Sequence, residues 1–396
     1  MPSRRVSLSR RLPAALAALV AVAAFGVVAA LLLDGDGDEG GERSASSAAL
    51  PEMATPLPAP TMAGLVAGPA SVPAVRVEGN QLVDAEGRPL RLLGVNRSSF
   101  EYACVQGWGI SEGPTDEASV QAISSWRVNA VRIPLNEHCW LGINGIKPKL
   151  GGDAYRRAVT EYVDVVNRAG LVAVLDLHWN APAGQTADRT QRMADADHSP
   201  EFWRSVASHF RDRPGVAFDL FNEPKGIDWA CWRDGCTTPK GWQAAGMQSL
   251  VDAVRAAGAT QPIIATGLQY GNDLSEWLEH RPHDPLGNTA AGFHVYDFNE
   301  CNDRRCWDRT VGSVAAVVPV VTTEAGQGDC RSDFITDFMR WADRRGVSYL
   351  GWTWNTWNCS DGPALIRTYE GEPTDFGAGV RRHLESVAAT AASPAG

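Results

Sequence analysis

The sequence predicts an α/β fold, and within that class a closed (β/α)8 (TIM) barrel over residues 75–390. Short apolar runs recur through this region, and each is followed by an amphipathic stretch typical of a helix. Such alternation gives a parallel sheet, and eight repeats of it favour closure into a barrel. An open, doubly wound sheet is the alternative, but no glycine-rich phosphate-binding turn follows the first strand.

The elements can be placed along the chain from these two patterns. A short N-terminal β-hairpin is expected first, with strands at 75–83 and 90–93 around a turn sequence at 84–87. The strands expected to form the barrel span residues 92–96, 130–135, 172–178, 216–222, 262–266, 292–296, 317–323 and 349–354. The helices expected to follow them span residues 116–126, 153–169, 200–211, 240–257, 273–280, 307–315, 332–345 and 376–389.

Residues 1–33 have the pattern of a signal peptide or of a transmembrane signal-anchor helix. Arginines precede an uncharged run at 12–33 that is long enough to span a bilayer. Basic residues in this position favour an orientation that places the following chain outside the cell. Residues 34–74, rich in acidic residues, Gly, Pro and Ala, are expected to be a disordered linker. The domain at 75–390 is therefore expected to be extracellular, either secreted or tethered to the outer face of the cell membrane.

The composition narrows the class of ligand. The formal net charge is −10, which argues against nucleic acid as a partner because phosphate binding needs basic patches. Fourteen Trp residues, against seven Tyr and eleven Phe, are unusual, and the broad indole face suits stacking on sugar rings. About half of these tryptophans are expected to lie in the core instead. The negative net charge and the high Trp content together therefore favour a carbohydrate as the ligand.

All eight cysteines lie beyond residue 100, in the part of the chain expected to be exported. An even number of cysteines in such a chain predicts disulfides. Cys231 with Cys236, and Cys301 with Cys306, could close small local loops, which would leave two long-range pairs. The sequence leaves the connectivity open, because eight cysteines allow many pairings. A zinc site is disfavoured, since no C-x2-C pair is present.

Polar and aromatic side chains gather at the C-terminal ends of the predicted strands, and in a barrel these ends meet at one mouth. Glu223 follows the fourth strand and Glu324 follows the seventh, so both carboxylates are expected to face this mouth. Paired carboxylates across a cleft are the equipment of glycoside hydrolysis, where one donates a proton and the other attacks the sugar. Arg132 would hold a neighbouring carboxylate ionised, and Tyr296 could donate a hydrogen bond to it.

The strand-four motif Asn222-Glu223-Pro224 resembles the signature of glycoside hydrolase family 5, the cellulase family, of the retaining (β/α)8 clan. The resemblance covers residues 75–385, and the further motifs occur in the family's order. It implies that Glu223 is the general acid/base and that Glu324 is the nucleophile. It also implies substrate-binding or supporting roles for Arg132, His178, Asn222, His294, Tyr296 and Trp354. Trp354 would be the tryptophan that stacks on the sugar, and Trp352 is the other candidate for that role.

The loops are the part of this chain that departs from the common cellulase pattern. The first barrel loop, at 94–109, differs from it, and the cysteine-bearing loops after the fourth and sixth strands are elaborated. Because these loops would build the subsites for sugar, the resemblance specifies the chemistry more closely than the substrate.

The leading hypothesis is a retaining glycoside hydrolase that cleaves O-glycosidic bonds of a β-linked polysaccharide, similar to an endo-β-1,4-glucanase. It would use a two-carboxylate double displacement and need no metal or organic cofactor. A transglycosylase, or a hydrolase of β-mannan, another β-glycan or a glycolipid, is the alternative on the same scaffold. A non-catalytic glycan-binding protein is a remote alternative, because neither carboxylate is missing. The expected partner is a β-linked oligo- or polysaccharide, and the expected state is a monomer with possible N-terminal membrane association.

Overall fold

The computed structural model describes residues 74–360 and 362–392. The predicted signal or anchor segment at 1–33 lies outside these residues, as does the predicted linker up to residue 73. Among the helices that the structure describes, none is long and apolar enough to cross a membrane.

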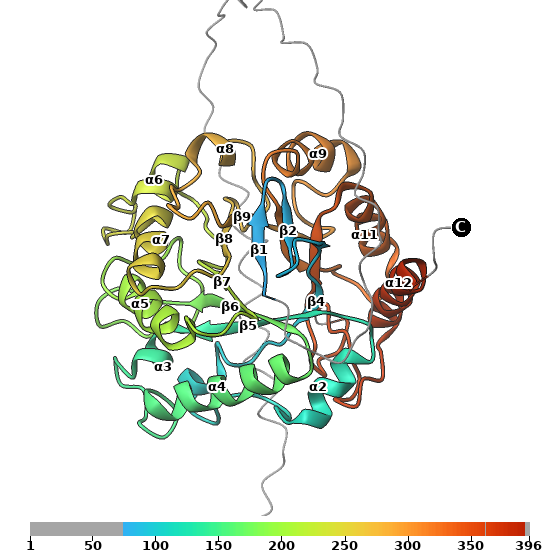
Figure 1. Cartoon of the computed structure of the whole chain (residues 1–396). Coiled ribbons are helices and arrows are strands. Elements are labelled where there is room, and N and C mark those ends of the chain that lie inside the picture. The colour runs from blue at the N-terminus through green and yellow to red at the C-terminus, as the bar shows by residue number, and fades with distance from the viewer. Residues whose placement is uncertain (1–73, 361, 393–396) are drawn as a thin grey trace, which may run out of the picture. The chain divides into compact units, whose positions relative to one another are not determined.

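Eight parallel strands close into a barrel, and helices surround it (Figure 1). Going round the barrel the order is β10-β11-β4-β5-β6-β7-β8-β9, so strands that are neighbours in sequence are also neighbours in space. The eight predicted strands and the closed barrel are therefore confirmed. The strands are β4 (Leu93–Asn96), β5 (Ala130–Asn136), β6 (Val172–Trp179), β7 (Val216–Asp219), β8 (Ile263–Thr266), β9 (Thr289–Val295), β10 (Val320–Ala325) and β11 (Ser348–Gly351).

A small antiparallel sheet precedes the barrel and lies over the centre of the ring in Figure 1. Its strands are β1 (Arg76–Glu78), β2 (Gln81–Val83) and β3 (Pro89–Leu90). The predicted hairpin between β2 and β3 is present, but the first predicted strand is divided in two by a turn at Gly79, where φ is +60°. Val75 and Leu82 pack in one buried cluster with side chains of the barrel strands, so this sheet closes one end of the barrel interior.

The helices around the barrel lie close to their predicted positions. The predicted stretch at 307–315 is divided into α9 and α10, and three short helices occur within loops where none was expected. They are α1 (Ala103–Gln106), α2 (Glu117–Ser124), α3 (Glu137–Leu141), α4 (Asp153–Arg168), α5 (Ser199–Phe210), α6 (Trp229–Asp234), α7 (Gly246–Ala256), α8 (Trp277–His280), α9 (Arg304–Arg309), α10 (Val311–Ala315), α11 (Asp333–Arg345) and α12 (Asp375–Ala392).

Helix α7 begins six residues later than the sequence pattern predicts. The residues before it are held by isolated bridges, in which Gln243 pairs with Thr237 and Ala244 pairs with Asp195. The disulfide between Cys231 and Cys236 closes the loop that approaches these bridges. The amphipathic pattern therefore extends over residues 240–245, but this segment is not helical because its backbone pairs with other segments.

The eight cysteines form four disulfides, and none is free. Three of the bonded cysteines lie in short helices that share one local device, an Asn or Asp N-cap three residues before the cysteine. The side chain of each cap accepts a hydrogen bond from the backbone N–H of that cysteine, which fixes the first turn of the helix. The disulfides join Cys104 to Cys139, Cys231 to Cys236, Cys301 to Cys306 and Cys330 to Cys359.

Candidate active site

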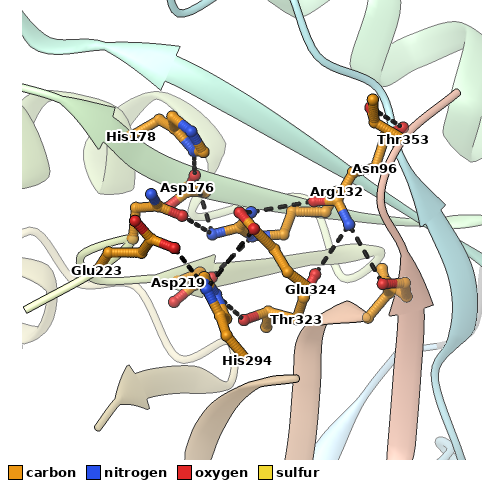
Figure 2. Close-up of polar contacts among 12 residues, drawn as sticks. Asn96, Arg132, Asp176, His178, Asp219, Glu223, His294, Thr323, Glu324 and Thr353 are labelled. Carbon is orange, nitrogen blue, oxygen red and sulfur yellow. Dashed lines mark hydrogen bonds and ion pairs between the residues drawn. The ribbon is translucent and has the colours of Figure 1, made fainter. Parts of the chain in front are cut away.

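The two carboxylates singled out from the sequence meet at the barrel mouth (Figure 2). Glu324 lies near the end of β10, and Glu223 lies four residues beyond β7. The backbone leading to Glu223 stays tied to both neighbouring strands, since Leu220 N donates to Ile264 O and Asn222 N donates to Leu177 O. An oxygen of Glu223 and an oxygen of Glu324 lie within 4.8 Å of each other. Glu324 is 5% exposed and Glu223 is 23% exposed, so Glu223 is the one open to the cleft.

Arg132, on β5, is fully buried beneath these carboxylates and bonds to several acidic groups. Its Nη1 donates to Glu324 Oε1 at 2.8 Å, and its Nε donates to Asp219 Oδ2 at 2.9 Å. Its Nη2 donates to Asn222 Oδ1 at 2.9 Å and lies 3.1 Å from Asp176 Oδ2. One guanidinium therefore positions the candidate nucleophile and the residue that precedes the candidate acid/base.

Ionising all three carboxylates around one buried cation would be unfavourable in free energy. Burial raises the pKa of Asp176 to about 7 and that of Asp219 to about 6, although the Arg132 guanidinium acts in the opposite direction on both. Near neutral pH these two aspartates therefore carry less than a full charge each. Arg132 is therefore surrounded by less negative charge than three fully ionised carboxylates would carry, and Asp176, Asp219 and Glu324 all act on it.

Tyr296, just beyond β9, completes the hydrogen bonding of Glu324. Its hydroxyl donates to Glu324 Oε2 at 2.7 Å. Burial and the nearby negative charge of Glu324 raise the pKa of Tyr296 well above its ordinary value, so the phenol keeps its proton and remains a donor. Both oxygens of Glu324 thus accept hydrogen bonds, which hold the carboxylate in place.

His294, on β9, bridges the two carboxylates. Its Nδ1 lies 3.3 Å from Glu223 Oε1 and 3.6 Å from Glu324 Oε2, and its Nε2 lies 3.0 Å from Thr323 Oγ1. Burial disfavours the charged imidazole, but the carboxylates of Glu324 and Glu223 outweigh burial and raise the pKa of His294. This histidine is therefore suited to hold a proton beside Glu223.

Glu223, the carboxyl that the sequence analysis expects to donate a proton, has a pKa that its neighbours lower. Burial raises its pKa, but the hydrogen bond to His294 and the charge of Lys225 outweigh burial, and the net pKa lies below its ordinary value. Without substrate the proton shared by this pair therefore resides mainly on His294.

His178, near the end of β6, lies beside the same cluster. Its Nδ1 lies 2.6 Å from Asp176 Oδ2. Burial lowers the pKa of His178 to about 3, so the ring is neutral over the working pH range. Its ring stacks on Trp352, with centroids 5.4 Å apart and planes 10° apart.

The two tryptophans after β11 have different environments, and the structure corrects the choice of Trp354 as the sugar-stacking residue. Trp354 is fully buried and meets Trp126 edge to face at 4.8 Å, so its ring belongs to the core. Trp352 is half-buried and lies against His178 at the mouth. Residues two apart in a strand share a face, but both tryptophans lie beyond the end of β11, so strand alternation does not decide which ring faces the mouth.

Two aspartates of this site were not predicted, although the sequence holds a signal for them. Asp176 and Asp219 are charged residues within otherwise apolar strand runs, and both are fully buried. A charged side chain in such a run must find a partner inside the protein. Arg132, the cation of the neighbouring strand run, was the available partner.

A cluster of aromatic residues near the mouth was also missed. Tyr102 lies at its centre, with ring centroids 6.0 Å from Trp108, 6.2 Å from Trp179 and 6.2 Å from Trp357. These residues come from the end of β6 and from the loops after β4 and β11, and Trp108 is 53% exposed. Of the fourteen tryptophans, nine are buried, which leaves five that can offer a ring to a ligand.

Donor atoms of Glu223, His294 and Glu324 lie within 4.8 Å of one another, a spacing that could accommodate a metal ion. In this structure His294 already lies within reach of both carboxylates, and Glu324 accepts from Arg132 and Tyr296. The polar atoms of these side chains therefore already have partners within the protein. The absence of a required metal or cofactor remains a prediction.

A barrel whose strand ends bring together two acidic groups, a buried arginine and exposed indoles has the architecture of a carbohydrate-active enzyme. The family model for Cellulase (glycosyl hydrolase family 5) matches residues 83–358, and the chain belongs to this family. The family membership expected from the sequence is thereby confirmed.

The chain is similar to Endoglucanase 1 of Robillarda sp. (strain Y-20), at 30% identity over 51% of this chain and 56% of that protein. It is also similar to a mannan endo-1,4-beta-mannosidase of Salipaludibacillus agaradhaerens, at 23% identity over 70% of this chain and 80% of that protein. The chain thus spans little more than half the length of some curated relatives that it matches.

Solved structures share the fold. The beta-glucanase SdGluc5_26A of Saccharophagus degradans aligns with a TM-score of 0.62 and 22% identity, covering 81% of this chain and 98% of that one. A second structure of that protein is a complex with cellotetraose, with a TM-score of 0.62 and 21% identity over the same shares of the two chains.

Proposed function

We propose that this chain is a retaining glycoside hydrolase that cleaves bonds within a β-linked polysaccharide. The observation that carries the proposal is the short distance, within 4.8 Å, between an oxygen of Glu223 and an oxygen of Glu324. Retaining enzymes hold their two carboxyls about 5–5.5 Å apart, whereas inverting enzymes need about 6.5–9.5 Å to admit a water molecule. The spacing therefore favours direct attack by a carboxylate on the sugar.

In the first step Glu324 attacks the anomeric carbon, and a bond forms between its carboxylate oxygen and the sugar. Arg132 and Tyr296 hold the attacking carboxylate in place. Glu223 donates a proton to the oxygen of the departing sugar. Because free Glu223 has a lowered pKa, the proton reaches it from His294, which lies 3.3 Å away.

In the second step water attacks the glycosyl-enzyme, and Glu223 takes the proton from that water. Esterification has by then removed the negative charge of Glu324, which lies 3.6 Å from His294 and helps to raise the pKa of that histidine. His294 gave up its proton in the first step, and with that charge gone it attracts a new proton less strongly until Glu324 is released. The release of sugar regenerates Glu324 and returns the proton to the Glu223–His294 pair.

The leading substrate is a β-1,4-glucan, and a β-mannan is the second candidate. Relatives named as endoglucanases support the first, and relatives named as mannan endo-1,4-beta-mannosidases support the second. The exposed aromatic cluster around Tyr102 is suited to stack on sugar rings of either kind. Transglycosylation shares the first step and is a matter of which acceptor, water or sugar, meets the glycosyl-enzyme.

The experiment that tests this function is reducing-sugar release from cellulose, mixed-linkage glucan, mannan, xylan and a glycolipid. Proton NMR of the first product from a hydrolysed oligosaccharide then reports its anomeric form. We expect release from a β-glucan or a β-mannan, with the β-anomer appearing first because two inversions restore the starting configuration. No release from any of these substrates, or the α-anomer as first product, would contradict the proposal.

The four disulfides are typical of an exported protein. We propose further that residues 1–33 direct export, that residues 34–74 are a linker, and that the monomeric domain acts outside the cell. N-terminal sequencing of protein from the culture medium and from the membrane fraction separates a cleaved leader from a retained anchor. Protein found with reduced cysteines in the cytoplasm would contradict this proposal.

A further inference from the structure

Lys225 lies two residues beyond Glu223 and is half-buried, and beyond its effect on the pKa of Glu223 the mechanism above gives its ammonium no contact with the substrate. Its Nζ lies 4.5 Å from the centroid of the Tyr270 ring, over the ring face. Among the described residues, this ammonium forms no ion pair within 4.0 Å of a carboxylate and no hydrogen bond. A cationic donor with its hydrogen-bonding capacity unused, beside a catalytic acid, is available to a ligand.

The ring beneath Lys225 is held by an unusual backbone. Gln269 and Tyr270 have φ of +51° and +61°, and Gly271 follows at +76°. Consecutive non-glycine residues in the left-handed region are uncommon, and such strain persists only where the surroundings enforce it.

The contacts of this turn show what enforces it. Tyr270 N donates to Pro224 O at 3.0 Å, and His294 N donates to Gly271 O at 2.9 Å. A side chain on Gly271 would meet His294, since a Cβ there would lie 2.8 Å from the imidazole Cγ. The turn is thus packed against both the acid/base segment and the histidine that serves it, and it fixes the Tyr270 ring relative to Glu223.

The direction of the reaction indicates which part of the substrate would lie beside Lys225. Glu223 protonates the oxygen of the departing sugar, so that sugar leaves past Glu223 and away from Glu324. The charges that act on Lys225 are those of Glu223 and Arg192. Arg192 donates from Nη1 to Gly226 O at 3.0 Å, whereas the Lys225 ammonium has only the ring as a close partner.

We propose that Lys225, held on the face of Tyr270, forms the subsite for the leaving sugar and donates hydrogen bonds to its hydroxyls. This inference rests on the proposed glycosidase function and adds the recognition of the departing part of the substrate. The ligand chemistry is a neutral, hydroxyl-rich sugar, whose oxygens accept hydrogen bonds from a cationic donor. Tyr270 is a positioning residue that fixes the ammonium through the cation–π contact.

The test compares two substrates in the Lys225→Met variant, which keeps the length of the side chain and removes its charge. The first is 4-nitrophenyl cellobioside or mannobioside, whichever the wild type cleaves, and its leaving group is a phenol. The second is the matching β-1,4-linked tetrasaccharide, whose leaving group is a sugar. We expect the ratio of kcat/KM for the tetrasaccharide to kcat/KM for the aryl glycoside to fall about tenfold to a hundredfold, as for a lost hydrogen bond from a charged donor. The fraction of folded protein cancels in this ratio.

Lys240→Met, the same change at an exposed turn lysine, is the matched control and is expected to leave the ratio at its wild-type value. Tyr270→Leu is expected to lower the ratio more than Tyr270→Phe, which keeps a ring face beneath the ammonium. An unchanged ratio in Lys225→Met would overturn the subsite assignment. Lys225 would then only pack on the Tyr270 ring. If the wild type cleaves neither substrate, the proposed function itself fails, which is a distinguishable result.

Discussion

At the scale of single residues, the division of labour between the two glutamates depends on their neighbours. Glu324 accepts from Arg132 and Tyr296, whereas Glu223 shares its environment with His294 and Lys225. A carboxylate that is anchored at both oxygens is suited to attack, and one that exchanges a proton with a histidine is suited to acid and base work. The assignment expected from the family resemblance therefore also has a physical basis in this chain.

Replacing Glu223 by Ala tests the acid/base role. We expect kcat/KM on oligosaccharide to fall about 10²- to 10⁴-fold, the usual contribution of a positioned proton donor. An aryl glycoside with a good leaving group needs no proton for departure, so formation of the glycosyl-enzyme is expected to survive. Added azide is expected to restore turnover and give a β-glycosyl azide, detected by NMR. The absence of any azide product from such a substrate would contradict the role of Glu223.

Trp352 and Trp354 offer a matched pair of substitutions that separates binding from stability. Trp354→Ala removes a fully buried ring and is expected to cost about 3–5 kcal/mol of unfolding free energy. Trp352→Ala removes a half-buried ring at the mouth and is expected to raise KM while Tm changes little. Thermal unfolding and steady-state kinetics measure the two effects. The opposite pattern would show that Trp354, and not Trp352, serves the substrate.

At the scale of elements, the disulfides and the short capped helices shape the loops around the mouth. Cys104–Cys139 closes 35 residues of chain across the loops after β4 and β5, whereas Cys231–Cys236 closes 5 residues within one loop. A disulfide restricts the unfolded chain more when the loop that it closes is longer. The two bonds should therefore differ in what they contribute to stability.

The double variants Cys104→Ser/Cys139→Ser and Cys231→Ser/Cys236→Ser test this difference. The loop-entropy relation gives losses of about 4 kcal/mol for the first and about 2 kcal/mol for the second. The first variant is therefore expected to have the lower Tm by calorimetry. Equal losses, or a larger loss for the short loop, would show that native contacts of the cysteines outweigh loop closure.

The sequence predicts the barrel well because each strand is an apolar run and each outer helix is amphipathic, and both patterns are local. It predicts Glu223 and Glu324 because strand ends share one mouth. It does not predict helices α3 and α6, although their Asn or Asp caps three residues before a cysteine are a local signal. The burial of Trp354 and the Lys225–Tyr270 contact depend on packing between distant segments, which no local pattern contains.

At the scale of the whole molecule, the folded protein buries several carboxyl groups, and burial disfavours their ionised form. Burial raises the pKa of Asp176 to about 7, that of Asp219 to about 6 and that of Glu101 to about 8. In the unfolded chain such groups titrate near pH 4. Between these values the folded protein binds protons that the unfolded chain releases, so the stability from these groups is complete near pH 4 and is lost as the pH rises to about 8.

We therefore expect Tm to fall from pH 5 to pH 8 at constant ionic strength. His178 and His138, whose pKa values burial lowers to about 3 and about 4, act oppositely below about pH 6.5 and offset part of the decline there. Asp284, whose pKa is lowered to about 2 by Arg255 against the effect of burial, acts oppositely but only as the pH falls below about 4. Calorimetry at pH 5, 6.5 and 8 measures the trend. In Asp219→Asn the part of the decline near pH 6 is expected to disappear. A Tm that rises from pH 5 to pH 8 would contradict this account of the buried carboxyls.

The central claim is that Glu324 forms a covalent bond to the sugar while Glu223 moves the proton. A 2-deoxy-2-fluoro aryl glycoside of cellobiose or mannobiose slows both steps, and its good leaving group lets the first step proceed, so the intermediate accumulates. Mass spectrometry of the intact protein and of its peptides then locates the adduct. We predict one glycosyl group per chain, on the peptide that contains Glu324. An adduct on the Glu223 peptide, or no adduct from an enzyme that hydrolyses the parent aryl glycoside, would contradict the mechanism.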